Sequence, residues 1–146
     1  MPLNHPNTEP ISDKLYRLEE NYIYTWKTKL GKKNMRVVQR TVIPKGFLYD
    51  GASVPRLVWT LSGIRPDGLI RAAALVHDYM YRHKGILPEG TYLYRDRKKT
   101  WHNLYAAWDR RSADKLFARI MREAGMSKFK RRIAYIAVRW FGKWSW

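Results

Sequence analysis

The chain has 146 residues, 45% of them hydrophobic and 14% aromatic, so it can bury the core of one ordinary domain and is not disordered by composition. It contains no cysteine, which excludes disulfides, thiolate metal sites and a cysteine nucleophile. Its 29 Lys and Arg residues against 12 Asp and Glu residues give a net charge of +17, which favours nucleic acid, an anionic membrane or an acidic protein surface as partner.

The first residues contain neither the basic n-region nor the apolar h-region of a signal peptide. We interpret residues 1–14 as a flexible arm and residues 15–146 as a single α+β domain, with a β part over about 15–50 and a helical part over about 55–146. No apolar run is long enough to cross a bilayer, so we expect a soluble protein.

Two segments rich in aromatic and β-branched residues predict the strands of a hairpin. They are Tyr22–Trp26 and Arg36–Ile43, with Gly31–Asn34 as the loop between them. A turn at Pro44–Gly46 leads into a third short strand at Phe47–Tyr49. The N-terminal part is therefore predicted to be a small antiparallel meander.

The first long helix is predicted to begin at Asp67. This residue is a good N-cap for a helix that continues to about His83 and is closed by Gly85. The polar stretch 87–100 is predicted to be a loop or flap, and Trp101–Trp108 to be a helical segment.

Two further helices are predicted after this segment, capped by Ser112 and Ser127, and the first of them ends at Gly125. Apolar residues at three- and four-residue spacing predict an apolar stripe along one face of each helix. These are Leu116, Phe117, Ile120 and Met121 on the first helix, and Phe129, Ile133, Ile136, Ala137 and Trp140 on the second. The predicted fold class is α+β, with the small N-terminal antiparallel β-meander followed by three or four helices.

The most specific chemical feature is the pair His77-Asp78 on the first predicted helix. Neighbouring helical residues project about 100° apart, and Tyr81 lies one turn on from His77. If the helix that carries Asp114 packs antiparallel to this one, Asp114 reaches one ring nitrogen of His77 and the other nitrogen is free to accept a proton from water. Asp78 then faces sideways as a hard oxygen ligand suited to Ca²⁺.

These residues resemble the phospholipase A2 superfamily, in particular the cysteine-free version carried on parvovirus capsid proteins. One helix there carries His-Asp-x-x-Tyr and a second carries an acidic residue followed by an aromatic one, which correspond here to His77, Asp78, Tyr81, Asp114 and Phe117. The resemblance implies two helices packed antiparallel as in phospholipase A2-like folds. It also implies that His77 is the general base, that Asp114 and Tyr81 complete the catalytic group, and that Asp78 binds calcium.

The calcium loop of that superfamily is rich in glycine, whereas the corresponding stretch of this chain contains a single glycine beside an acid. Asp50 and Gly51 are the metal ligands that the resemblance predicts there, in addition to Asp78.

Three signatures resemble a family of small uncharacterised phage and prophage proteins that is described as a domain of unknown function. They are Ile43-Pro44-x-Gly46-Phe47-x-x-Asp50-Gly51-Ala52-Ser53-Val54-Pro55, Arg71-Ala72-Ala73-x-x-Val76-His77-Asp78-x-x-Tyr81 and Ala113-Asp114-x-x-Phe117. The resemblance implies a phage origin and a location in the virion or the host cytoplasm.

The C-terminal segment is cationic and rich in tryptophan, and from Ser127 onward it contains no acidic residue. Such a helix is typical of an interfacial helix on anionic lipid, and equally of a core helix with a solvated basic face. The residues predicted to contact a membrane or another polyanion are Lys128, Lys130, Arg131, Arg132, Lys143, Trp144 and Trp146.

Three functions are compatible with the sequence. The first is a phage-encoded, calcium-dependent lipid esterase of phospholipase A2 type that acts at an anionic membrane. The second is a non-enzymatic protein that contacts other virion proteins or the host. The third is a nonspecific nucleic-acid binder that uses phosphate contacts and aromatic stacking.

Overall fold

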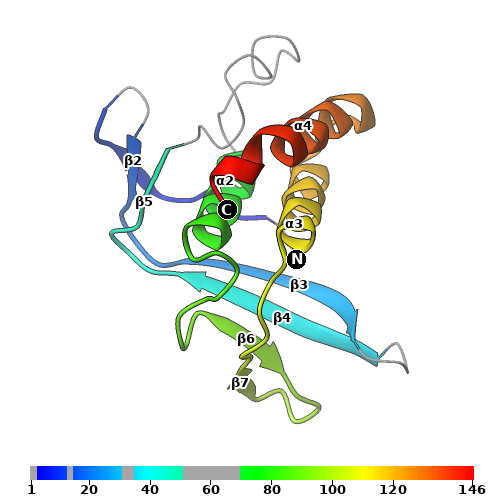
Figure 1. The fold of residues 1–146 in the computed structure, drawn as a ribbon. Helices are drawn as coiled ribbons and strands as arrows, with labels where there is room; N and C mark the ends of the chain where they lie inside the picture. Colours follow the sequence, from blue (N-terminus) through cyan, green and yellow to red (C-terminus); the bar gives the residue numbers. More distant parts are fainter. Residues whose placement is uncertain (1–2, 13–14, 31–34, 51–69) are drawn as a thin grey trace.

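The computed structural model describes residues 3–12, 15–30, 35–50 and 70–146. Two antiparallel sheets and three α-helices make up this part of the chain (Figure 1). The first sheet has the order β1-β2-β5, formed by Thr8–Pro10, Leu15–Leu18 and Leu48–Asp50. The second has the order β3-β4-β6-β7, formed by Tyr22–Leu30, Met35–Ile43, Tyr92–Arg95 and Trp101–Asn103. The helices are α2 (Ile70–Arg82), α3 (Arg110–Glu123) and α4 (Lys128–Phe141), and a 3-10 turn, η2 (Gly142–Trp144), follows α4.

The predicted fold class, a single N-terminal meander followed by helices packed as in phospholipase A2, is wrong. The strands divide between two sheets, and β6 and β7 come after α2 in the chain yet extend the sheet that β3 and β4 begin. The arm predicted over residues 1–14 contributes β1, which pairs with β2.

The loop predicted at 87–100 is interrupted by β6, and the helical segment predicted at Trp101–Trp108 is wrong because β7 begins there and forms a hairpin with β6. These strands are only four and three residues long, and β6 pairs with β4, which lies about fifty residues earlier. Their stability depends on this non-local pairing, which local sequence patterns do not reveal.

The hairpin of β3 and β4 confirms the two strands that the sequence predicted, although both are longer than expected, and the loop between them lies outside the described residues. Its helix-facing side is aromatic: Tyr24 stacks on Trp26, and Trp26 contacts Tyr92 and Trp108. This cluster joins the sheet to the helices, which lie together on one side of it (Figure 1).

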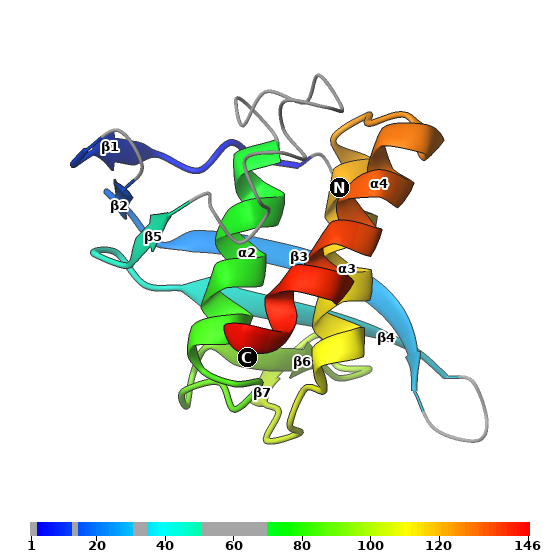
Figure 2. The same cartoon turned by 45° about the horizontal axis from the view of Figure 1, so that its top comes forward.

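Helix α2 is the centre of the core. Every residue from Ala72 to Tyr81 is buried, which is typical of a helix that is covered on all sides. It contacts α3 on one flank and β5 on another (Figure 2). The predicted start of this helix at Asp67 lies outside the described residues.

The predicted end signals are largely confirmed. Ser127 caps α4 by accepting a hydrogen bond from the Lys130 amide, and Gly125 follows α3 with a φ of +82°. The N-cap of α3 is Asp109 rather than Ser112, and its carboxylate accepts a hydrogen bond from the Ser112 backbone N–H. The helix therefore begins three residues earlier than predicted.

The apolar stripe predicted on α4 is buried only in part, at Ala137 and, less completely, at Ile133. Phe129 and Trp140 are 74% and 71% exposed, whereas the buried residues are Ala134, Ala137 and Val138. Small side chains on this face let the helix axis approach α3, so the larger apolar residues are turned outward.

Gly85 lies just after the end of α2 and beside two distant parts of the chain, at Trp108 and Trp146. This glycine has a φ of +76°, its carbonyl accepts a hydrogen bond from the Trp108 amide, and an added Cβ would lie 2.0 Å from the Trp108 carbonyl oxygen. Gly90 has a similar φ of +79° but open space around it.

We expect Gly85→Ala to lower the free energy of unfolding by more than about 2 kcal/mol, since it adds a backbone clash to the strain of a positive φ. The control Gly90→Ala carries the strain alone and should cost about 1 kcal/mol. Chemical denaturation measures both variants, and equal losses would contradict the role given to Gly85.

Candidate active site

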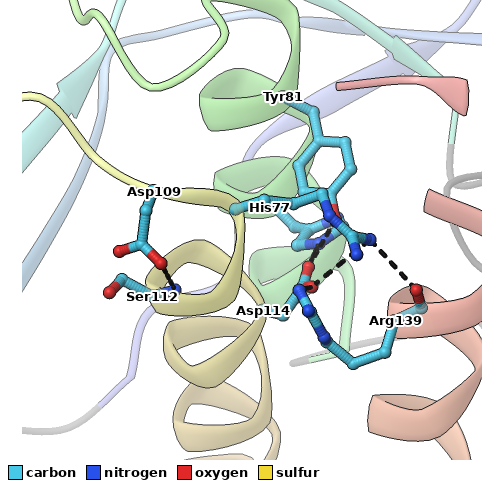
Figure 3. A network of polar contacts seen from close by, with 7 residues as sticks. His77, Tyr81, Asp109, Ser112, Asp114 and Arg139 are labelled. Carbon is cyan, nitrogen blue, oxygen red and sulfur yellow. Dashed lines mark hydrogen bonds and ion pairs between the residues drawn. The ribbon is translucent and has the colours of Figure 1, made fainter. Parts of the chain in front are cut away.

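The structure brings His77 of α2 and Asp114 of α3 together. The His77 Nε2 atom lies 2.8 Å from Asp114 Oδ1, and both side chains are fully buried (Figure 3). His77 occupies the middle of α2, and Asp114 the second turn of α3. The pairing of these two helices therefore positions the dyad.

Two further side chains donate hydrogen bonds to the same carboxylate. The Tyr81 hydroxyl donates to Oδ1 at 2.5 Å, and Arg139 of α4 donates to Oδ2 at 2.8 Å. Arg110 lies 3.9 Å from Oδ2 and also donates to the carbonyl of Arg139. The carboxylate of Asp114 thus links three helices.

These contacts keep Asp114 ionised. Burial alone raises the pKa of its carboxyl, but hydrogen bonds from His77, Tyr81 and Arg139 bring the pKa below the usual value for Asp. Burial raises the pKa of Tyr81, so its hydroxyl keeps its proton and acts as a donor.

The state of His77 follows from that of Asp114. An ionised carboxylate can only accept hydrogen bonds, so Nε2 carries the ring proton and Nδ1 has a free lone pair. Burial lowers the pKa of His77, and this outweighs the opposite effect of Asp114, so the ring is neutral. The Nδ1 atom is buried and has no hydrogen-bond partner among the described residues.

The imidazole is held between two aromatic rings. Its centroid lies 4.1 Å from that of Tyr81 and 4.9 Å from that of Phe117. Trp146 packs edge-on against the far side of Tyr81, with 5.0 Å between ring centroids, and a Cβ at Gly142 would lie 2.7 Å from the Tyr81 hydroxyl. The end of the chain therefore keeps Tyr81, and through it His77, in place.

The predicted metal ligands Asp78 and Asp50 also meet. Asp78 is buried, and its pKa is raised well above the usual value by burial and by the charge and hydrogen bonding of Asp50, at the end of β5. Gly51 lies outside the described residues. Within the described ranges no group of three or more acidic or histidine side chains forms a metal site.

Two carboxyl groups in contact are a donor set that suits a hard divalent cation, because the cation removes their mutual repulsion. Asp78 and Asp50 therefore fit calcium chemically.

The predicted surface residues divide into two groups. Lys128, Arg132, Lys143 and Trp144 are exposed, whereas Lys130, Arg131 and Trp146 are partly buried. In the described part of the chain no helix is both long and apolar enough to cross a membrane.

The sequence prediction missed Arg139 and Arg110. No sequence pattern distinguishes Arg139 from the other cations of its helix, and only the rotation of α4 in the structure shows that it reaches Asp114. Arg110 lies four residues before Asp114 on α3, a spacing that indicates an ion pair in any helix.

Residues 16–138 match the family described as "Protein of unknown function (DUF1353)". The chain belongs to this family. No curated protein and no solved structure matches it. The DUF1353 match includes His77, Tyr81 and Asp114 and ends one residue before Arg139.

In this DUF1353 domain we expect Arg139→Met to lower the free energy of unfolding by about 2–3 kcal/mol, because a buried carboxylate loses a charged donor. The control is Arg132→Met, an exposed position of the same helix, with an expected change within about 0.5 kcal/mol. Denaturant titration compares the two variants. Equal losses would mean that the ion pair with Asp114 does not stabilise the helix layer.

Proposed function

We propose that this chain is a bacteriophage-encoded, calcium-dependent ester hydrolase with phospholipase A2-like chemistry that acts on anionic membranes. One observation carries the proposal: a neutral histidine is oriented by a buried carboxylate while its Nδ1 atom has no partner among the described residues. The proposal concerns the catalytic groups and not the fold. The signatures around Asp50, His77 and Asp114 support the phage origin.

The unpartnered Nδ1 atom favours a catalytic role over packing alone. Leaving a buried acceptor unpaired costs about 1–3 kcal/mol, so such an atom calls for an explanation. A base that is already neutral and held in one tautomer is ready to accept a proton at neutral pH. Asp114 supplies both properties through the hydrogen bond to Nε2.

In the proposed reaction, water gives a proton to His77 Nδ1 as its oxygen attacks the carbonyl carbon of the ester. The ionised Asp114 stabilises the imidazolium that forms. When the tetrahedral intermediate collapses, the bond from carbon to the leaving oxygen breaks and that oxygen takes the proton from Nδ1. The products are a fatty acid and a lysophospholipid.

Calcium would be held by Asp78 and Asp50, where it would polarise the ester carbonyl. Asp78 follows His77 directly on α2, so the helix that carries the base also carries the proposed ligand. The contact between Asp78 and Asp50 supports this part of the proposal.

The outer side of α4 and of the turn η2 that follows it supports action at a membrane. Large apolar side chains are exposed along it, and exposed cations accompany them: Phe129, Ile136, Trp140, Phe141 and Trp144, with Lys128, Arg132 and Lys143. Aromatic side chains beside cations are typical of helices that lie on anionic lipid.

One observation favours a second candidate, a non-enzymatic virion or host-interaction protein. The side chains of His77 and Asp114 have 0% exposure, so water has to reach Nδ1 before the proposed chemistry can occur. In the second candidate the His77–Asp114 network serves only to hold the helices together.

His77→Gln separates the two candidates. Gln keeps a donor for Asp114 but lacks the base, so we expect fatty-acid release from anionic phosphatidylglycerol vesicles with calcium to fall about 10²–10⁴-fold while the fold is retained. His102→Gln, at an exposed position on β7, is the matched control and should leave the rate unchanged. Because burial lowers the pKa of His77, kcat/KM should fall at acid pH with an inflection below 6.5.

A wild-type chain that releases no fatty acid above the vesicle background would refute the hydrolase. So would a folded His77→Gln variant that retains the wild-type rate, and either result would favour the structural candidate.

Calcium binding has a readout that does not depend on turnover. Because the pKa of Asp78 is raised in the folded protein, the protonated Asp78–Asp50 pair stabilises the fold at low pH. This stabilisation is lost as the pH rises through the raised pKa. We therefore expect a calcium concentration tenfold above the Kd at neutral pH to raise Tm by at least about 3 °C, and the same concentration to raise it less at lower pH, where Asp78 is protonated.

Asp78→Asn should abolish this shift in Tm. The matched control is Asp96→Asn, which removes a carboxylate from the β6–β7 turn and should leave the shift intact. Equal shifts in wild type and Asp78→Asn would exclude Asp78 as a calcium ligand.

A further inference from the structure

The four-stranded sheet has a face that the described helices do not cover. Tyr24, Trp26, Gln39, Thr41 and Tyr92 are buried against the helices. Since side chains alternate along a strand, the residues between them point the opposite way, onto what we call the outer face.

The outer face is strongly basic. It carries Lys27, Lys29, Arg36, Arg40 and Arg95, together with Trp101. The four strands contain no acidic residue, either on this face or on the other.

The register of the strands gathers these side chains. Lys27 pairs with Val38, Val38 with Arg95, and Arg95 with Trp101, so one row crosses all four strands. Lys29 pairs with Arg36 in the neighbouring row. Rows of cations at the spacing of sheet strands present a continuous path for a polyanion.

Two guanidinium groups lie on the indole of Trp101. The guanidinium carbon of Arg40 is 3.9 Å from the ring centroid and that of Arg95 is 5.6 Å away. Burial and the proximity of Arg95 lower the pKa of Arg40. Cations and a π surface therefore meet at one place, as in surfaces that stack unpaired bases.

A cavity of about 590 Å³ adjoins this row. It lies at the end of β6 beside the β6–β7 turn, and both sides of the sheet contribute to it. Arg36, Val38 and Arg95 of the outer face line it with Arg97 and Lys99 of the turn, and Met35, Val37 and Tyr94 line it from the other side. It also contains Asp96, but that carboxylate already accepts hydrogen bonds from His102, at 2.9 Å, and from the Thr100 amide, at 2.8 Å. The volume lies within the range of small-ligand sites.

We propose that the outer face binds single-stranded nucleic acid, with phosphates on its cations, a base stacked on the Arg40–Trp101 pair and a nucleotide in the adjoining cavity. A duplex keeps its bases stacked inside, whereas a single strand presents them to an aromatic side chain. Anionic lipid fits less well, because the protruding aromatic side chains that insert into lipid lie on α4. This activity is independent of the proposed hydrolysis.

The test is fluorescence anisotropy of a labelled oligothymidylate with the full chain. We expect the double variant Arg40→Gln/Arg95→Gln to raise Kd at least about tenfold. It should also reduce the slope of log Kd against log salt by about 0.7 for each phosphate that the protein no longer neutralises. The matched control, Lys128→Gln/Arg132→Gln, removes the same charge from α4 and should change Kd less than about threefold.

Trp101→Leu separates stacking from charge. It should weaken oligothymidylate binding at least about fivefold but leave binding of heparin, a polyanion without bases, unchanged. Trp101→Phe keeps an aromatic ring and should restore most of the affinity, which also guards against a folding defect.

Equal losses in the sheet variant and the α4 control would overturn the proposal in favour of diffuse attraction. An unchanged Kd for oligothymidylate in Trp101→Leu would show that no base stacks on this indole. If Arg40→Gln/Arg95→Gln lost binding to phosphatidylglycerol vesicles to the same extent, the outer face would be a lipid-binding surface instead. The nucleic-acid proposal and the hydrolase proposal are tested separately. His77→Gln removes the proposed catalytic base and should bind oligothymidylate with the wild-type Kd, so a loss of nucleic-acid binding would not contradict the hydrolase.

Discussion

The ionised carboxylate of Asp114 is the constraint on which the helix layer depends. It has no exposure to solvent, and a charge in that position is tolerated only when several donors surround it. The donors come from α2 and α4, while Asp114 itself belongs to α3. The three helices therefore have to be in place together, and displacing any one of them leaves a buried charge with too few partners.

The same carboxylate determines what His77 can do. Because Asp114 stays charged, the proton of the imidazole remains on Nε2 and the lone pair on Nδ1. Structural and chemical roles are thus not alternatives for Asp114, since the interaction that stabilises the helix layer also sets the tautomer of the histidine. For the Nδ1 atom of His77 a structural and a chemical role are alternatives. This acceptor has no partner among the described residues, so it contributes nothing to stability.

Sequence patterns predicted the site better than the fold. The contact between His77 and Asp114 was expected on the condition that their helices pack together, and the resemblance of His77, Tyr81 and Asp114 to a known catalytic group made that packing the natural expectation. The hairpin of β6 and β7 was missed since its stability comes from pairing with β4. Periodicity located a stripe on α4 but left open whether it faces the core or the surface, so neither the exposure of Trp140 nor the reach of Arg139 could be decided from the sequence.

The net charge of +17 does not by itself distinguish lipid from nucleic acid, because both are polyanions that attract cations over similar distances. Short-range chemistry separates them. On α4 the cations accompany apolar side chains that protrude into solvent, whereas on the outer face they stack on an indole within a sheet. The helix α4 lies across the helix layer from β6 and β7 (Figure 1). The two basic surfaces therefore face different directions, and a membrane seated on α4 leaves the outer face of the sheet accessible.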